Sequence, residues 1–344
     1  MAQYKQRPAS SATGPGARIV VGPGRPIGTL DRKVFGGFVE HLGRCINGGI
    51  FDEGSALSDS KGFRRDVVLA LLKPLRLSVL RWPGGNFASS YRWADGIGPR
   101  SSRPARVELA WGGVESNHFG TDEFLACRAD LGATPYICPN MGTGDMSEAL
   151  DWVEYCNSAT NSYWANQRRG NGREEPYGEV YWGLGNEMYG DWQVGQLSAE
   201  EYMALASRWA KAIRRADPQV KLVSCGQSRW SAWDRTVIDG LVDLVDLHSV
   251  HIYTGSLDYW TNALSPHQAE PAIAYTSTFL SQAAYADHVS ADARIDRAAP
   301  TGHKTLAGNV QLEDPSKQTS GSTTVFRLPP CSFAVFEGPI EMEH

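Results

Sequence analysis

Short apolar stretches alternate with amphipathic helical stretches over residues 33–289, and this alternation limits the folds open to the chain. Short apolar runs bounded by Gly and Pro are typical of buried strands, whereas apolar residues three and four apart are typical of helices. The pattern therefore predicts a parallel α/β fold. The predicted strands cover residues 33–43, 77–86, 134–142, 179–187, 220–226 and 242–253. The predicted helices cover residues 62–75, 121–132, 147–157, 198–218 and 266–289.

Local signals mark the ends of several of these helices. Thr121 is a suitable N-cap for the second helix, and Gly132 is a suitable stop. Ser198 followed by Glu201 forms a capping box at the start of the clearest helix, which Pro218 ends. The first helix is expected to bury an apolar stripe made of Val67, Val68, Leu71, Leu72 and Leu75.

Six strand–helix units in order, each with a loop after its strand, predict a (β/α)₈ TIM-barrel-type domain. A doubly wound open sheet is also compatible with this pattern. The pattern stops near residue 289, where a polar stretch rich in Ala, Gly, Pro and Ser begins. Two strands of a full barrel are not identified, so the barrel is predicted to be incomplete.

The segments outside the barrel give the expected domain organisation. Residues 1–16 are expected to form a disordered tail, and residues 17–32 contain an N-terminal strand. The barrel occupies residues 33–289, and a low-complexity linker occupies residues 290–323. Residues 324–344 then alternate like a strand with a Pro-Pro break.

Charge and composition give no reason to expect nucleic acid or a membrane as a partner. The net charge is −5, and no apolar run is long enough to span a bilayer. The N-terminus lacks the apolar segment of a signal peptide, which favours a cytoplasmic protein. The six cysteines are scattered without a C-x-x-C pair, so we expect buried thiols in a reducing compartment. No metal-binding or phosphate-binding motif is present, so we expect no cofactor.

Polar side chains stand where the predicted strands end. Because the carboxyl ends of barrel strands form the active-site face, these side chains are expected to line one pocket. Carboxylates, amides and a phenol suit a ligand with many hydroxyl groups, and a glutamate after a strand suits an acid catalyst. The residues are Glu40, Asn86, Asn140, Asn186, Glu187 and Tyr253, and Trp82, Trp111, Trp182 and Trp192 could add flat walls.

Structural explanations compete with these roles. Most of the tryptophans could pack in the core, which is the commoner use of this residue. Glu187 could be a solvated or capping residue at a strand end. Glu40 could form an ion pair with Arg44 or Arg81.

Five longer motifs resemble those of the glycoside hydrolase family 51 α-L-arabinofuranosidases. The resemblance covers about residues 17–288 and a short C-terminal piece, and the motifs occur in the family's order. The motifs are FGGFVEHLGRCINGGIFDEGS, LRWPGGNFASSYRWADGIGP, LAWGGVESNHFGTDEF, WGLGNEMYGDWQVG and HIYTGSLDYWTNALSPHQAE.

The resemblance implies a (β/α)₈ barrel joined to a β-sandwich that includes the N-terminal strand and a C-terminal region. It implies hydrolysis of terminal, non-reducing α-L-arabinofuranosyl residues of arabinan or arabinoxylan oligosaccharides, with retained configuration and no metal. A homo-oligomer is also expected, because family members are often hexamers.

The resemblance also assigns roles by motif. Glu187 in GLGNE resembles the general acid/base, and Asn186 resembles a ligand of the sugar 2-hydroxyl. A neighbouring anionic nucleophile would raise the pKa of such an acid/base toward the working pH. The remaining positions are Glu40 and Asn86, which resemble hydroxyl ligands, Trp111, which resembles a wall of the arabinose subsite, and Tyr253, which resembles the tyrosine that orients the nucleophile.

The nucleophile motif of the family is not found in this sequence. The family carries it near the end of the seventh strand, in a motif close to Asp-Glu-Trp-Asn, and nothing after residue 253 matches. Three hypotheses follow: an arabinofuranosidase, a truncated and catalytically impaired homologue that at most binds arabinosides, or an interaction protein completed by a partner strand. The late glutamates Glu313, Glu337, Glu341 and Glu343 have no matching context.

Overall fold

The computed structural model describes residues 31–178, 180–227, 231–253 and 255–298 of the chain, with side chains up to residue 284. In this part, six short parallel strands form one sheet in the order β1-β2-β5-β6-β7-β8. A separate two-stranded antiparallel hairpin pairs β3 with β4. The strands are β1 (Gly37–Phe38), β2 (Val79–Trp82), β3 (Arg106–Val107), β4 (Val114–Glu115), β5 (Thr134–Ile137), β6 (Tyr181–Leu184), β7 (Lys221–Ser224) and β8 (Leu247–His248).

The strand order decides between the two predicted architectures. In a doubly wound sheet the order reverses at a switch point, whereas in a barrel each strand lies beside the next one in sequence. Here every main-sheet strand pairs in parallel with its successor along the chain. The described residues therefore form part of a (β/α)₈ barrel, and the predicted fold class is confirmed.

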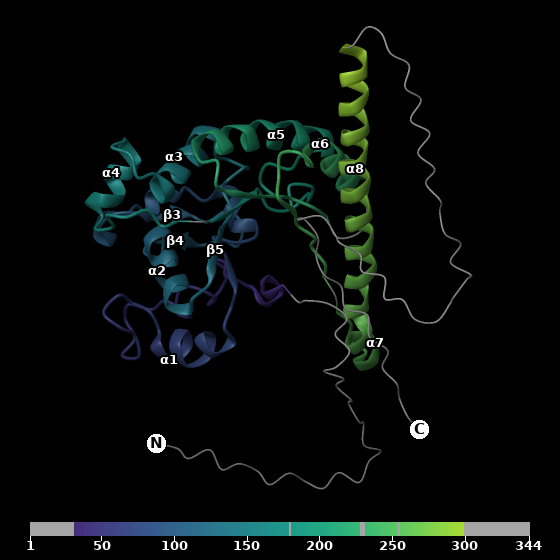
Figure 1. The fold of residues 1–344 in the computed structure, drawn as a ribbon. Coiled ribbons are helices and arrows are strands. Elements are labelled where there is room, and N and C mark those ends of the chain that lie inside the picture. The colour runs from purple at the N-terminus through teal and green to yellow at the C-terminus, as the bar shows by residue number, and fades with distance from the viewer. Residues whose placement is uncertain (1–30, 179, 228–230, 254, 299–344) are drawn as a thin grey trace, which may run out of the picture. The chain divides into compact units, whose positions relative to one another are not determined.

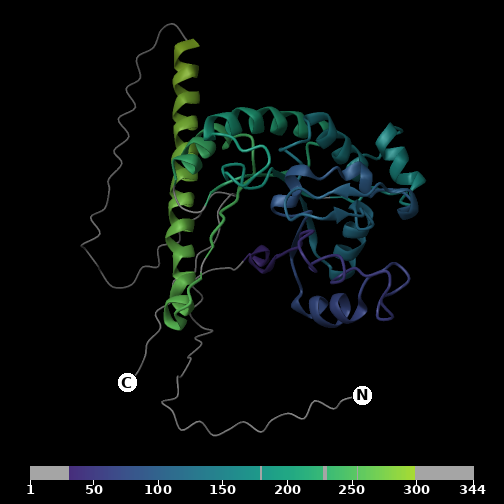
Figure 2. The same cartoon turned by 180° about the vertical axis from the view of Figure 1, so that it is seen from behind.

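Helices connect the strands and cover one side of them. In Figure 1, α1, α2, α3, α5 and α6 follow one another in an arc around the strands, and Figure 2 shows the same arc from behind. The α-helices are α1 (Arg65–Val67), α2 (Thr121–Leu131), α3 (Met146–Asn157), α4 (Tyr163–Gly170), α5 (Ala199–Ala216), α6 (Ala232–Leu241), α7 (Tyr259–Leu264) and α8 (Ala269–Ala298). Short helical turns are η1 (Arg32–Phe35), η2 (Val68–Leu72), η3 (Lys73–Leu75), η4 (Asn86–Ser90), η5 (Trp93–Gly96), η6 (Arg100–Ser102) and η7 (Ser265–Gln268).

An aromatic core lies between the strands and the helices. The Trp82 ring stacks on Phe124 of α2, with ring centroids 5.0 Å apart and planes 18° apart. Trp152 of α3 meets both Trp82 and Trp182 edge-on, each at 5.8 Å. Because side chains alternate along a strand, Arg81 faces the other side of the sheet from Trp82. Trp82 and Trp182 are fully buried in this core, so their predicted role as walls of a sugar site is wrong.

The first predicted helix is irregular. Residues 65–75 pass from an α-turn through a π-turn into a 3₁₀-turn. Pro74 lacks a backbone N–H and cannot continue regular helical hydrogen bonding, and Arg76 follows with a left-handed φ of 52°. Of the apolar stripe, Val68 is buried, whereas Leu71 and Leu75 are more than half exposed.

Other helix boundaries agree with the sequence signals or differ by a residue. The capping box is present, since Ser198 N donates to Glu201 Oε2 at 2.8 Å and Glu201 N donates to Ser198 Oγ. Gly132 ends α2 in the left-handed conformation. The N-cap of α2 is Gly120 rather than the predicted Thr121, because the Gly120 N–H is the group that Glu123 satisfies.

Several elements were not predicted. These are α4, α6, α7 and the β3–β4 hairpin, and α6 ends directly before the start of the sixth predicted strand. Helix α8 packs against α6 and runs to Ala298, beyond the predicted end at residue 289. The extension is rich in Ala and Arg, which are strong helix formers. The predicted tail 1–16, most of the N-terminal strand segment 17–32, strand 324–344 and most of linker 290–323 lie outside the described residues.

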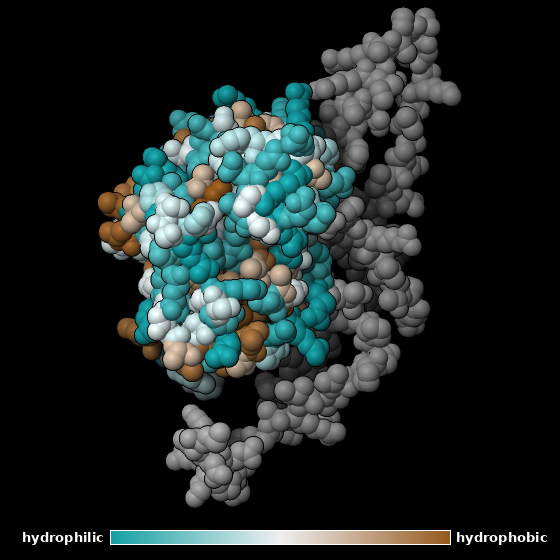
Figure 3. Space-filling view, turned by 90° about the vertical axis from the view of Figure 1, so that its left-hand side faces the viewer, coloured by the Kyte–Doolittle hydropathy of each residue, from teal (hydrophilic) through white to brown (hydrophobic). Residues whose placement is uncertain are grey.

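The surface is mixed. The face in Figure 3 shows small separate hydrophobic spots among hydrophilic residues. Within the part of the chain that the structure describes, no helix combines the length and apolar character needed to cross a bilayer. Cys127, Cys138, Cys156 and Cys225 are buried free thiols as predicted, but Cys45 is exposed.

Candidate active site

Of the six positions whose roles the family resemblance assigns, five come directly from the carboxyl ends of β1, β2 and β6 or from the loop after β8. Glu40 follows β1, Asn86 follows β2, and the pair Asn186–Glu187 follows β6. Tyr253 follows β8, whereas Trp111 comes from the loop of the β3–β4 hairpin. Because the strands are parallel, their carboxyl ends lie at one edge of the sheet.

Glu187 is buried and held by three donors. Its Oε1 accepts hydrogen bonds from His251 Nδ1 at 2.9 Å and from the Tyr253 hydroxyl at 3.2 Å. Its Oε2 accepts one from Trp192 Nε1 at 3.3 Å. The backbone of Glu187 has a φ of 45°, a left-handed conformation that is uncommon for a residue with a side chain. Such strained positions cluster at functional sites.

These donors set the protonation state of Glu187. Burial raises the pKa of the Glu187 carboxyl. The hydrogen bond and charge of His251, together with the hydrogen bonds from Trp192 and Tyr253, outweigh burial, so the pKa is lowered. The carboxylate is therefore ionised at neutral pH. The pKa therefore lies below the working pH in this part of the chain, because the groups bonded to Glu187 are donors and the described residues bring no second carboxylate to it.

Arg81 is a site residue that sequence reasoning missed. Its Nη2 donates to Asn186 Oδ1 at 2.8 Å, and its guanidinium lies over the rings of Phe38, at 5.0 Å, and Tyr136, at 5.3 Å. Within the described structure, Arg81 Nε and Asn186 Nδ2 are buried without a hydrogen-bond partner. The period-two alternation of β2 could have indicated that Arg81 faces the barrel interior, opposite to Trp82.

Glu40 is oriented by two donors on one oxygen. Its Oε1 accepts from Phe87 N at 3.1 Å and from Trp111 Nε1 at 2.9 Å. Gly84 and Gly85 allow this packing, because a Cβ on Gly84 would lie 2.5 Å from Glu40 Cγ.

The ion pair considered for Glu40 does not form. Arg44 donates to the Gly48 carbonyl oxygen at 3.0 Å, and Arg81 donates to Asn186. Glu40 is thus a buried carboxylate of the strand-end site, bonded to an amide N–H and an indole N–H.

Two of the four tryptophans considered as walls are available to a ligand. Trp111 is 45% exposed and Trp192 is 58% exposed. Each donates its indole N–H to one of the two site glutamates, Trp111 to Glu40 and Trp192 to Glu187. Their rings can therefore lie beside a ligand that contacts these carboxylates.

The three remaining residues have different surroundings. Asn86 accepts a hydrogen bond from Gln193 Nε2 at 2.6 Å. The Asn140 side chain stabilises the turn that follows it, since its Oδ1 accepts hydrogen bonds from the backbone N–H groups of Gly142 and Thr143. Asn140 is therefore structural, contrary to its predicted place in the pocket. Tyr253 is 83% exposed, and its hydroxyl donates to Glu187.

His251 and Gln193 were also missed. His251 stands two residues before Tyr253 in the HIY motif, so alternation could have placed both on the same face. Gln193 joins Asn86 to Ser89, whose hydroxyl donates to Gln193 Oε1 at 2.7 Å. Nothing in the local sequence indicates this long-range contact.

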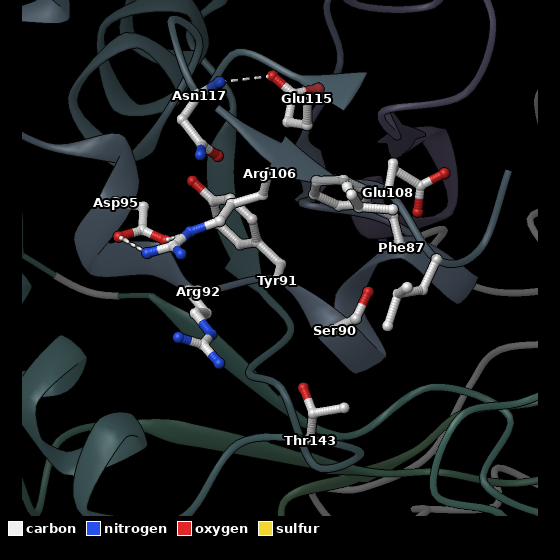
Figure 4. A pocket seen from close by; sticks show the side chains of 12 residues that line it. Phe87, Ser90, Tyr91, Arg92, Asp95, Arg106, Glu108, Glu115, Asn117 and Thr143 are labelled. Atoms are coloured by element: carbon white, nitrogen blue, oxygen red, sulfur yellow. Dashed lines mark hydrogen bonds and ion pairs between the residues drawn. The ribbon is translucent and has the colours of Figure 1, made fainter. Parts of the chain in front are cut away.

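A hollow of about 210 Å³ lies beside the β3–β4 hairpin (Figure 4). Its lining includes Phe87 and Glu108, which contact the Glu40 region and the Trp111 loop, but it does not include Glu187. Within the described residues, no three His, Cys, Asp or Glu side chains gather as a metal site would need.

Comparisons with known proteins identify the family of the chain. Residues 71–267 match the family model described as the alpha-L-arabinofuranosidase 1 domain. The chain is 49% identical over 286 residues to a probable alpha-L-arabinofuranosidase C of Aspergillus terreus, covering 80% of this chain and 56% of that protein. It is 41% identical over 247 residues to the intracellular exo-alpha-(1->5)-L-arabinofuranosidase of Halalkalibacterium halodurans, covering 70% and 49%. The chain thus spans about half the length of the curated relatives it matches.

Solved structures show the same likeness. The GH51 alpha-L-arabinofuranosidase from Thermotoga petrophila RKU-1 superposes with a TM-score of 0.70 at 46% identity, covering 73% of this chain and 52% of that one. A family 51 alpha-L-arabinofuranosidase from Bifidobacterium longum gives 0.72 at 39% identity, covering 77% and 55%. This chain belongs to the glycoside hydrolase family 51 α-L-arabinofuranosidases.

Proposed function

We propose that the chain carries the acid/base half of a retaining α-L-arabinofuranosidase site. The substrate class is oligosaccharides of arabinan or arabinoxylan with terminal, non-reducing α-L-arabinofuranosyl residues. The observation that carries the proposal is Glu187, a buried carboxylate in a left-handed backbone conformation, bonded to His251, Tyr253 and Trp192. The family relationship supports the choice of sugar.

The other strand-end residues would hold the arabinosyl ring. Glu40 and Asn86 would bind hydroxyl groups, and Asn186 would bind the 2-hydroxyl beside the reacting carbon. Trp111 would cover one face of the ring, as its half-exposed indole allows. Tyr253 would hold Glu187 in place through its hydrogen bond.

In the reaction, Glu187 would give a proton to the leaving oxygen and later take one from the attacking water. A retaining site also needs a nucleophilic carboxylate about 5–5.5 Å from the acid/base. We assign that role to no residue of the described part, and Glu313, Glu337, Glu341 and Glu343 lie outside it. A second carboxylate at that distance would raise the pKa of Glu187, which His251 lowers in this structure.

Two further expectations belong to this proposal. We propose a cytoplasmic protein, which is supported by the composition of the chain and by the name of the intracellular bacterial relative. A homo-oligomer remains a prediction that chromatography with light scattering would test.

The test is hydrolysis of p-nitrophenyl α-L-arabinofuranoside by the purified chain and by Glu187→Ala. Glu200→Ala on the exposed face of α5 is the matched control. We expect activity that falls about 10²–10⁴-fold in Glu187→Ala and is unchanged in Glu200→Ala. Azide, which needs no general base, should restore part of the lost rate. A folded wild-type chain without activity would refute the proposed activity and favour the impaired homologue.

A further inference from the structure

The hairpin that carries Trp111 is short and exposes its two valines. The β3–β4 hairpin has two residue pairs, Arg106 with Glu115 and Val107 with Val114. Val107 and Val114 are 74% and 72% exposed, so they bury little apolar surface. A two-stranded hairpin of this kind is not stable by itself. Other contacts must therefore hold Trp111 against Glu40.

One of these contacts is the buried pair of His41 and Glu115, which is next in sequence to the hydrogen bond between Trp111 and Glu40. Glu40 accepts the indole N–H of Trp111, and the next residue, His41, bonds Glu115 through Nδ1 at 2.9 Å. The His41 and Glu115 side chains are only 1% and 7% exposed. By contrast, the ion pair between Arg106 and Asp95 is half exposed on the arginine side, and such pairs contribute little.

The hydrogen bonds of His41 determine its tautomer. Trp82 Nε1 can only donate, and it lies 3.1 Å from His41 Nε2, so Nε2 must accept. Nδ1 therefore carries the proton and donates to the Glu115 carboxylate. The His41 ring also stacks on Phe87 at 4.3 Å, and the Phe87 N–H donates to Glu40.

Both oxygens of Glu115 are occupied. Oε2 accepts from His41 and from Asn47 Nδ2 at 3.2 Å, and Oε1 accepts from Asn117 N at 2.8 Å. Figure 4 shows the bond between Glu115 and Asn117 at the wall of the hollow. Only a carboxylate can accept on both oxygens in this way, because an amide presents an NH₂ group on one side.

We propose that His41 and Glu115 are positioning residues that hold the Trp111 loop over the arabinose subsite. The proposal rests on the proposed function for the identity of the sugar. The core residue Trp82 fixes His41, and His41 and Asn47 fix Glu115. Glu115 then sets the end of the hairpin from which Trp111 reaches Glu40.

The test replaces Glu115 by Gln and follows Trp111 directly. An amide NH₂ facing His41 Nδ1–H or the Asn117 N–H creates a clash of donors, and His41 cannot change tautomer without a similar clash at Trp82. The protein is labelled with 5-fluorotryptophan, and the Trp111 line among the eleven tryptophans is assigned with Trp111→Phe. Binding of L-arabinose is measured in parallel. Glu53→Gln is the matched control, because it removes the charge of an exposed Glu–His pair, with His118, that lies outside the Trp111 loop.

We expect Glu115→Gln to stay folded, to move or broaden the Trp111 line, and to weaken L-arabinose binding about 10-fold. Glu53→Gln should change neither. A folded Glu115→Gln protein with an unchanged Trp111 line and unchanged affinity overturns the proposal. If Glu115→Gln does not fold, Asn47→Ala removes one donor to the same oxygen, and an unchanged Trp111 line there also overturns it. A wild-type chain that binds no L-arabinose refutes the proposed function, whereas the Trp111 line still decides the positioning role.

Discussion

Trp82 and Trp182 provide a matched pair for testing how buried hydrogen bonds stabilise this fold. Both side chains have no exposed surface, and both meet Trp152 edge-on at 5.8 Å. They differ at the indole nitrogen. Trp82 Nε1 donates to His41, whereas Trp182 Nε1 finds no acceptor in the described structure. The two substitutions to compare are Trp82→Phe and Trp182→Phe.

The shared cost comes from lost packing, and the difference comes from the hydrogen bond. Trp→Phe removes roughly three buried non-hydrogen atoms, which is worth about 2 kcal/mol. Trp82→Phe also leaves His41 Nε2 as a buried acceptor without a donor, which adds about 1–3 kcal/mol. Trp182→Phe instead removes an unpaired donor, which offsets about 1–3 kcal/mol of its packing cost. We expect a loss of about 3–5 kcal/mol for Trp82→Phe and a change within about 1 kcal/mol of zero for Trp182→Phe.

Urea unfolding followed by far-UV circular dichroism measures the difference. With slopes of about 1–3 kcal/mol per molar urea, the two midpoints should differ by about 1–4 M. Equal midpoints at equal slopes would refute the reasoning, since packing alone would then account for both residues. A larger loss for Trp182→Phe would mean that its indole N–H has a partner.

Three further predictions rest on titration and exposure. Because the pKa of Glu187 is lowered, its contribution to stability is present above the unfolded pKa of about 4.3 and is lost as pH falls through the folded value. The stability difference between wild type and Glu187→Gln, measured by urea unfolding, should therefore shrink below about pH 4, and a constant difference would contradict this. Burial, with Asp145 nearby, raises the pKa of Glu148 to about 7, so wild type should lose stability as pH rises from the unfolded pKa of about 4.3 to that value. Glu148→Gln should gain about 1–2 kcal/mol on wild type between about pH 5 and 8, after solvent screening is allowed for, and no gain would contradict this. Among the described cysteines, exposed Cys45 should react first with iodoacetamide at about pH 8, as peptide mass spectrometry would show, because burial raises the pKa of Cys127 and Cys225 to about 12. Earlier modification of either buried thiol would contradict this.

The sequence predicts the barrel well because its signals are periodic and local. Alternating strands and helices identify all six main-sheet strands, and the capping box at Ser198 and the stop at Gly132 mark real helix ends. The strands themselves are shorter than predicted. The β8 strand, for example, has two residues in place of the predicted run 242–253, because residues 242–245 complete the turn after α6.

The candidate site is less predictable, because its contacts join distant segments. The local sequence places Glu187 and Glu40 at strand ends, but it does not show which donors surround them. The bonds of Glu187 to His251 and of Glu40 to Trp111 span 64 and 71 residues. Asn140, whose side chain accepts a hydrogen bond within its own turn, shows that an amide at a strand end can stabilise a turn instead of binding a ligand.

The hydrogen-bonding capacity left at the strand ends argues for hydroxyl groups as the ligand. Within the described structure, Arg81 Nε and Asn186 Nδ2 are buried donors without acceptors, and each such group costs about 1–3 kcal/mol until it is paired. Glu40 Oε2 has no donor among the described residues, since both hydrogen bonds go to Oε1. A phosphate or carboxylate ligand could accept from the two donors, but it would meet the negative charges of Glu40 and Glu187. A sugar hydroxyl both accepts and donates hydrogen bonds, so it satisfies both kinds of group without adding charge.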